Sequence, residues 1–453
     1  MLSRIGHILW KTIKWTLLIA VPLFALLVLI NWRDEALSDE ALALLETTLI
    51  EVPDNENIFV AMAGFNAPEE DDIFEAGRRE IEKIKSESVN GKEVTIEPSK
   101  EKGEKREKLR WREVKPAFDC EFDKKTNFLE CVRFQKERLE KTLVANETFI
   151  RRYRLLQELP HYAVPLAAQD WGALEKGPLV RRVQTLLIAQ SVLEVAAGNA
   201  IEGLTFFKQD MALWRRSLEG KSNAPEGAVA VTMMTNGVIG VSFLLSSPSV
   251  GIEAQASEWR EMLAPLSHKQ ARLRPVVEAE FRFIQKSLSE VPHNPPVYRL
   301  NATNNHLVPL FETWLTLVDL PWKNYIEQRD EARVLLADLY KPKINWAYNP
   351  IGKMLGNIAY QSLDKVVDNM AGRFHDNNAY LRLVRLQLEL RLAKIPSEEI
   401  PAFIEQLDEP YCAPCSDFSW DAETRMLSFQ PYNEKNFTRH ASASVYVPDV
   451  RGP

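Results

Sequence analysis

Residues 15–32 read WTLLIAVPLFALLVLINW, eighteen residues without a charge. At a rise of ~1.5 Å per residue, a helix of this length measures about 27 Å, close to the thickness of the hydrocarbon core of a bilayer. Trp15 and Trp32 lie where aromatic side chains gather at membrane interfaces, and Pro22 is tolerated inside a span. We therefore predict one transmembrane helix over residues 15–32, with Trp15, Pro22 and Trp32 as its anchor residues.

The charges on the two sides of this span differ, with basic residues before it and mostly acidic residues after it. They are Arg4, Lys11 and Lys14, then Arg33, Asp34, Glu35, Asp39 and Glu40. The positive-inside rule therefore places residues 1–14 in the cytoplasm and the bulk of the chain outside it. A cleaved signal peptide is the alternative, but residues 30–33, Ile-Asn-Trp-Arg, offer no small-x-small cleavage site. A buried core helix would show a polar face, so we expect an uncleaved signal anchor.

The composition sets limits on the rest of the chain. With 453 residues, 45% hydrophobic and 26% charged, it is typical of folded protein. We expect no second membrane span, which excludes a transporter with many spans. The formal charge of -7, from 56 basic and 63 acidic residues, argues against a nucleic-acid partner.

Apolar residues recur at helical spacing through most of the body, and prolines fall between the stripes. This pattern predicts a juxtamembrane segment (33–85) and an all-α domain (116–410), built as a helical bundle or an irregular α-solenoid. The predicted helices of that domain cover residues 134–159, 178–195, 197–218, 252–263, 270–288, 307–317, 322–339, 350–370, 378–395 and 397–407.

The last part of the chain, residues 411–453, has a different texture. Two short aromatic and apolar runs, Phe418–Trp420 and Met426–Phe429, flank a polar turn and predict a small β-hairpin. Beyond Pro431 alternation occurs only at residues 443–447, so we expect a tail along the surface.

Residues 86–115 contain few apolar side chains and a dense alternation of Lys, Arg and Glu. This composition predicts a solvated, mobile excursion. A basic patch for an anionic lipid or polymer is the functional alternative, but the interspersed glutamates dilute its charge.

The four cysteines form two local pairs. Cys120 and Cys131 flank a polar turn, and in an oxidising compartment we expect them to form a structural disulfide. Cys412 and Cys415 form a Cys-x-x-Cys motif, which is typical of thiol–disulfide exchange when it opens a helix after a strand. Here a helix and Pro410 precede it and a hairpin follows, so we favour a second structural disulfide. Zinc binding by all four cysteines is a weaker alternative, because one pair alone has knuckle spacing.

No sequence motif indicates a catalytic, cofactor-binding or metal-binding site. The seven histidines include no H-E-x-x-H, and there is no G-x-S-x-G, Walker loop or G-x-G-x-x-G. Gly237 and Gly240 are flanked by apolar residues and indicate close helix packing rather than a phosphate cradle. We therefore predict no catalytic residue, metal or cofactor.

Three further segments carry a resemblance: N57IFVAMAGFNAP68, the NPIGK of Asn349–Lys353, and the EPYCAPCSDFSWD segment closing with MLSF. Together with the basic N-terminal anchor, they resemble uncharacterised single-pass inner-membrane proteins of Gram-negative bacteria. The resemblance implies an inner-membrane location with a periplasmic body and implies no activity. We expect a binding or scaffold protein that serves an envelope assembly through a protein partner. A periplasmic hydrolase or thiol oxidoreductase, with a site assembled from distant residues, is the alternative.

Overall fold

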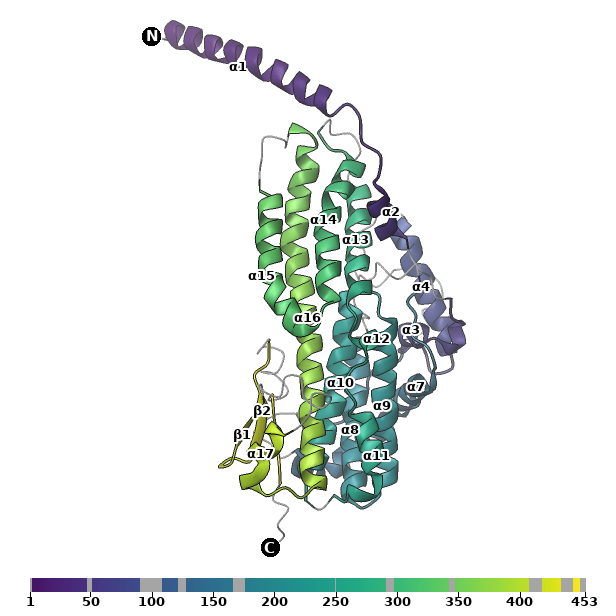
Figure 1. Cartoon of the computed structure of the whole chain (residues 1–453). Coiled ribbons are helices and arrows are strands. Elements are labelled where there is room, and N and C mark those ends of the chain that lie inside the picture. Colours follow the sequence, from purple (N-terminus) through teal and green to yellow (C-terminus); the bar gives the residue numbers. More distant parts are fainter. Residues whose placement is uncertain are drawn as a thin grey trace. The chain divides into compact units, whose positions relative to one another are not determined.

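The computed structural model describes residues 2–46, 51–89, 108–120, 128–165, 176–248, 250–290, 297–341, 347–406, 418–432 and 443–448. These residues are mainly helical, with one small antiparallel sheet near the C-terminus, which confirms the predicted all-α class (Figure 1). The chain divides into two compact units. We name residues 1–48 with 277–367 the anchor unit, and residues 49–276 with 368–453 the cavity unit.

The anchor unit contains the N-terminal helix and an antiparallel helical group. Its elements are α1 (Leu2–Ile30), α2 (Asp39–Leu45), most of α13 (Arg274–Ser289), α14 (Leu300–Val318), α15 (Trp322–Leu339) and the first part of α16 (Pro350–Leu392).

Helix α1 is continuous through Pro22 and begins before the predicted span. Its segment Trp10–Ile30 is long and apolar enough to cross a membrane, and none of it is buried. Trp15 is 63% exposed and Trp32 is 71% exposed. The structure thus presents an exposed apolar helix near the N-terminus, which is a candidate membrane anchor.

Hydrogen bonds join the end of α1 to the body of the anchor unit. The buried side chain of Asn31 donates to the carbonyl oxygen of Ala347 at 2.9 Å and accepts from the backbone N–H of Asn349 at 2.6 Å. Asp34 accepts from the backbone N–H groups of Asn301 and Ala302, in the first turn of α14. A carboxylate at that position satisfies donors that have no partner within the helix. The connection between α1 and the bundle is therefore a defined contact.

The cavity unit is built around α8 (Gly177–Ala196), α9 (Ala200–Gly220) and α10 (Ala224–Leu245), which pack against one another (Figure 1). Shorter elements surround them: η1 (Asp54–Glu56), α3 (Ile58–Ala63), α4 (Ile73–Val89), α5 (Phe128–Phe134), α6 (Lys136–Ala145), α7 (Glu147–Glu158), η3 (Glu253–Gln255), α11 (Ala256–Met262), α12 (His268–Ala271), η5 (Ser397–Glu399) and α17 (Ile400–Glu405). The sheet has the order β1 (Phe418–Asp421), β2 (Met426–Phe429), β3 (Ser444–Tyr446).

Helix α10 corrects the expectation that residues 15–32 alone are long and apolar enough to span a bilayer. It passes the same test of length and hydropathy, but 72% of its apolar window is buried inside the cavity unit. It is therefore a core helix. A Cβ on Gly240 would approach Ile188 and Phe207 to 2.7 Å, which confirms that this glycine serves close helix packing.

The predicted break between helices 350–370 and 378–395 is wrong, because α16 is one helix of 43 residues. The polar residues in its middle have partners elsewhere in the cavity unit. Asp376 accepts from the backbone N–H of Tyr432, and Asn377 donates to the hydroxyl of Thr235. Side-chain groups that bind distant partners in this way do not compete for the helix's own backbone, so the helix continues.

The predicted hairpin is present, with Trp420 opposite Leu427. Residues 443–447 were expected to trail along the surface, but their alternation produces the third strand, β3, which pairs with β2. In the predicted excursion, residues 86–89 belong to α4, residues 90–107 lie outside the described chain, and residues 108–115 are described without regular structure.

Candidate functional site

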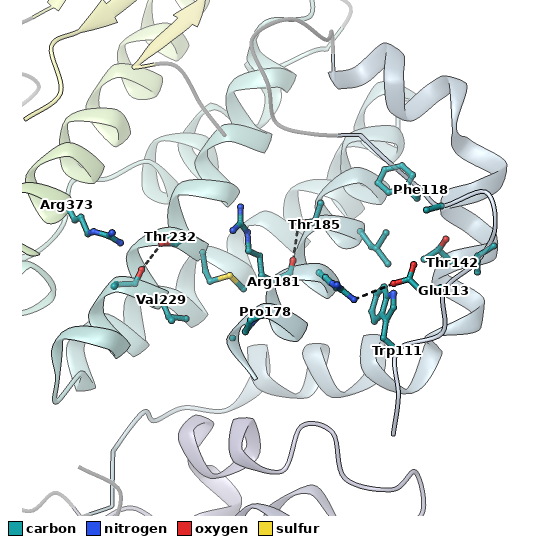
Figure 2. Close-up of a pocket in the computed structure, with 17 residues that line it drawn as sticks. Trp111, Glu113, Phe118, Thr142, Pro178, Arg181, Thr185, Val229, Thr232 and Arg373 are labelled. Atoms are coloured by element: carbon teal, nitrogen blue, oxygen red, sulfur yellow. Dashed lines mark hydrogen bonds and ion pairs between the residues drawn. The ribbon is translucent and has the colours of Figure 1, made fainter. Parts of the chain in front are cut away.

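The cavity unit contains a cavity of about 760 Å³. This volume falls in the range of roughly 300–1,000 Å³ that is typical of small-molecule sites. Its lining consists of Trp111, Glu113, Val114, Ala117, Phe118, Thr142, Gly177, Pro178, Arg181, Arg182, Thr185, Leu186, Ala228, Val229, Thr232, Met233 and Arg373. These side chains come from α6, α8, α10, α16 and the non-helical segment around Trp111 and Phe118 (Figure 2).

One wall of the cavity is a non-helical segment, residues 108–120, which we name the strap. Asn146 receives a hydrogen bond from the backbone N–H of Arg112 and returns one to its carbonyl oxygen. The side chain of Gln135 forms the same two-way pair with the backbone of Asp119. The indole of Trp111 lies on the ring of Phe149, with the ring centroids 6.0 Å apart. The strap is therefore attached along its length to α5–α7.

The strap also explains an error in the helix prediction. A single helix was expected over residues 134–159, but the chain forms α5, α6 and α7, with breaks at Gln135 and Asn146. These are the two residues whose side chains bind the strap backbone.

A disulfide closes the C-terminal end of the strap. The Sγ atoms of Cys120 and Cys131 are 2.08 Å apart, as predicted for this pair. It links the last strap residue to α5, two residues beyond the lining side chain of Phe118. Cys412 and Cys415 lie outside the described residues.

The lining of the cavity carries excess positive charge. Three arginines and one glutamate leave two net positive charges in a chain whose formal charge is -7. The Arg182 guanidinium lies 3.6 Å from the Glu113 carboxylate, but both side chains are exposed, so this ion pair contributes little stability. Arg373 donates from Nε to the side chain of Asn369 at 3.0 Å. Arg181 is half-buried and lies between Arg373 and Glu113 in Figure 2.

The threonines of the lining keep their hydroxyl protons within their own helices. Thr142, Thr185 and Thr232 each donate to the carbonyl oxygen four residues earlier, at 2.7, 3.0 and 2.8 Å. They therefore offer acceptor lone pairs to a ligand, and the guanidiniums are left as the charged donors.

The first turn of α8 adds to this positive character. Gly177 and Pro178 line the cavity and begin a helix of 20 residues, whose N-terminus carries partial positive charge. Proline at this position has no N–H, and its fixed φ suits the first turn of a helix.

A separate buried polar network connects α7, α8, α9 and α10. The carboxylate of Asp210 accepts hydrogen bonds from Tyr153 and, at 2.8 Å, from Gln184, while Trp214 donates to the Tyr153 hydroxyl. Gln184 in turn accepts from Asn236 at 3.2 Å. Burial raises the pKa of Asp210 to about 6, although these hydrogen bonds act in the opposite direction. None of these five side chains lines the cavity, so we assign the network to the core.

Two more buried ionisable groups lie near the start of α10. Burial raises the pKa of Glu226 to about 7, and this carboxylate accepts from the backbone N–H of Ser222 and the amide of Asn223. Burial lowers the pKa of Lys221 to about 7, and its ammonium donates to the carbonyl oxygens of Leu218 and Gln270. Since their hydrogen bonds are with backbone and capping groups, and the Lys221 ammonium also lies 4.9 Å from the centroid of the Phe374 ring, we assign both to the local structure.

Among the described residues, no group of three or more His, Cys, Asp or Glu side chains could hold a metal ion. No protein-family model, no curated protein and no solved structure matches this chain.

Sequence reasoning missed the cavity residues. Trp111 and Glu113 fell within the predicted excursion, and Arg181 and Arg182 fell within the predicted helix 178–195, to which no site was assigned. The one available signal was the basic pair Arg181-Arg182, separated by two residues from Gly177-Pro178, and a pair is too short to distinguish a site from a solvated surface.

Proposed function

We propose that this protein is a membrane-anchored binding protein of the bacterial envelope, and that its ligand occupies the cavity between the strap and α8, α10 and α16. The observation that carries the proposal is the cavity of about 760 Å³, in which nine of the 17 lining residues are apolar and a few charged groups converge. This mixture is typical of sites that bury a small molecule and orient it by polar contacts.

In the membrane we assign α1 as the span, with residues 1–14 in the cytoplasm and the two folded units in the periplasm. The charge difference across the apolar segment supports this orientation, and the exposure of Trp10–Ile30 supports membrane insertion. The Cys120–Cys131 disulfide is consistent with an oxidising compartment. The resemblance to inner-membrane proteins of Gram-negative bacteria points to the same location.

The cavity favours binding over purely mechanical scaffolding. Among the described residues, its lining has one carboxylate, on Glu113, and no histidine or cysteine, so these residues are suited to recognition rather than acid–base or thiol chemistry. We also propose that the protein serves an envelope assembly through a protein partner. It presents the bound molecule to that partner or withholds it.

A cavity-filling variant tests this function. Ala228 lines the cavity on α10, so Ala228→Trp places an indole in the ligand volume, whereas Ala402→Trp adds the same group to an exposed position on α17. Native mass spectrometry of full-length protein released from its membrane should detect a bound small molecule on the wild type and on Ala402→Trp. Ala228→Trp should lack it. Equal occupancy of all three proteins, or no bound species on any of them, would contradict the proposal.

A further inference from the structure

We propose that the ligand of this cavity is an anionic amphiphile, with a carboxylate or phosphate head group held by Arg181 and an apolar chain against the strap. The inference rests on the proposed function and specifies its ligand class. Four observations lead to it: the excess positive charge of the lining, the threonine hydrogen bonds, the helix start at Gly177, and the apolar strap wall.

The head-group position follows from the donors. Within the described part of the chain, no hydrogen bond or ion pair engages the Arg181 guanidinium, whereas Arg182 pairs with Glu113 and Arg373 with Asn369. Arg181 lies in α8 four residues after the helix start at Gly177, and both residues line the same cavity. A guanidinium and a helix N-terminus together favour an anion, and a planar guanidinium can bind two oxygens of a carboxylate or phosphate at once.

The wall that would hold the chain is apolar. Trp111, Val114, Ala117 and Phe118 follow one another along the strap, and Leu186, Val229 and Met233 face the cavity from α8 and α10. In Figure 2, Trp111 and Phe118 lie on one side of Arg181, and Arg373 lies on the other. Burying an alkyl chain against such a surface removes apolar area from water, which stabilises the complex.

The opposite charge class is disfavoured by the same groups. A cationic head would meet three guanidiniums and find one carboxylate, already paired with Arg182. A neutral sugar or peptide would require several donors and acceptors, but the lining threonines have directed their protons into their own helices. An anion with an apolar body matches what remains.

The test uses full-length protein in phosphatidylcholine nanodiscs, with empty nanodiscs as the blank, and isothermal titration calorimetry. The probes share an eight-carbon chain and differ in charge: octyl phosphate, octanoate, octanol and octyltrimethylammonium. Octyl phosphate and octanoate should bind at least ten-fold more tightly than octanol, and octyltrimethylammonium should not bind. If all four bind equally, the charge class is overturned while ligand binding in the cavity stands.

Two arginine variants assign the head group. Arg181→Gln should weaken octyl phosphate binding roughly ten-fold or more and leave octanol unchanged, because it removes a charge-assisted hydrogen bond. Arg154→Gln removes the same charge from an exposed site on α7 and should change neither affinity. Equal losses in the two variants would contradict a local role for Arg181.

Two further ligands identify the source of the anion. Dihexanoylphosphatidylglycerol represents a membrane lipid, and inorganic phosphate represents a free anion. Binding of the lipid or of octyl phosphate supports the proposal. Tighter binding of the lipid indicates a membrane lipid as the ligand, and tighter binding of octyl phosphate indicates a free amphiphilic acid. Inorganic phosphate binding as tightly as octyl phosphate would overturn the amphiphile. If Ala228→Trp leaves the affinity for every probe unchanged, or no probe binds, the proposed function fails as well.

Discussion

The side chain of Asn146 and the backbone of Arg112 hydrogen-bond to each other in both directions, at 3.0 and 2.9 Å. Asn146 is 3% exposed and lies where α6 ends and α7 begins. One residue thus sets a helix break and also positions the strap, which forms a wall of the cavity.

Replacing Asn146 should therefore destabilise the strap. Asn146→Ala leaves the N–H and carbonyl of Arg112 without these partners, and we expect the free energy of unfolding to fall by about 1–3 kcal/mol. Asn199→Ala, at an exposed position before α9, should cost less than about 0.5 kcal/mol. Denaturant titration of the two variants compares them, and equal losses would show that the Asn146 contact contributes nothing specific.

The disulfide should stabilise the same wall. Cys120 and Cys131 are 11 residues apart, and for a loop of this size the chain-entropy relation gives roughly 3 kcal/mol. We expect the double change Cys120→Ser with Cys131→Ser to lower the melting temperature and to increase hydrogen exchange in residues 111–118. A reductant should have the same effect on the wild type. A wild type that melts identically with and without reductant would contradict this prediction.

Asp210 should make stability depend on pH. Its pKa is about 6 in the folded protein and about 3.9 in an unfolded chain, so the folded state binds the proton more tightly. The contribution of Asp210 to the free energy of unfolding is therefore fully present below pH 4. This contribution, about 3 kcal/mol, is lost as the pH rises through 6.

Asp210→Asn keeps the shape and removes this dependence. The difference in unfolding free energy between variant and wild type should grow in favour of the variant from pH 4 to pH 7. Taking the difference cancels the contributions of Glu226 and Lys221, whose pKa values are also shifted. Asp330→Asn, at an exposed carboxylate, supplies the comparison and should show no such growth. A difference that stays constant with pH would mean that Asp210 is not buried as described.

The packing of α10 gives a matched pair of glycine variants. Gly240→Ala places a Cβ 2.7 Å from the side chains of Ile188 and Phe207, and overpacking of this kind costs about 1–3 kcal/mol. A Cβ on Gly251 meets no heavy atom within 4 Å, so Gly251→Ala should be neutral within about 0.5 kcal/mol. Thermal unfolding of both variants tests the prediction, and equal melting temperatures would contradict it.

Local periodicity was enough to predict most of the helices and the hairpin, because stripes such as Leu381–Leu388 and pairs such as Trp420 and Leu427 are local features. Helix α10 was not among the predicted helices. Periodicity failed where distant partners decide. A helix ends at Asn146, whose side chain hydrogen-bonds to the backbone of Arg112. Helix α16 continues through Asn377, whose side chain hydrogen-bonds to Thr235 instead. The cavity was beyond prediction for the same reason, since the strap and α8 are brought together only by the fold.

The most direct test of the account is photo-crosslinking inside the cavity. A benzophenone amino acid at Thr232, in full-length protein within intact membranes, should yield an adduct with an anionic amphiphile of low mass after irradiation. The same group at Ala402, on the exposed face of α17, should not. Identical adducts from both positions, or no small-molecule adduct from Thr232, would contradict the claim that this cavity is the binding site.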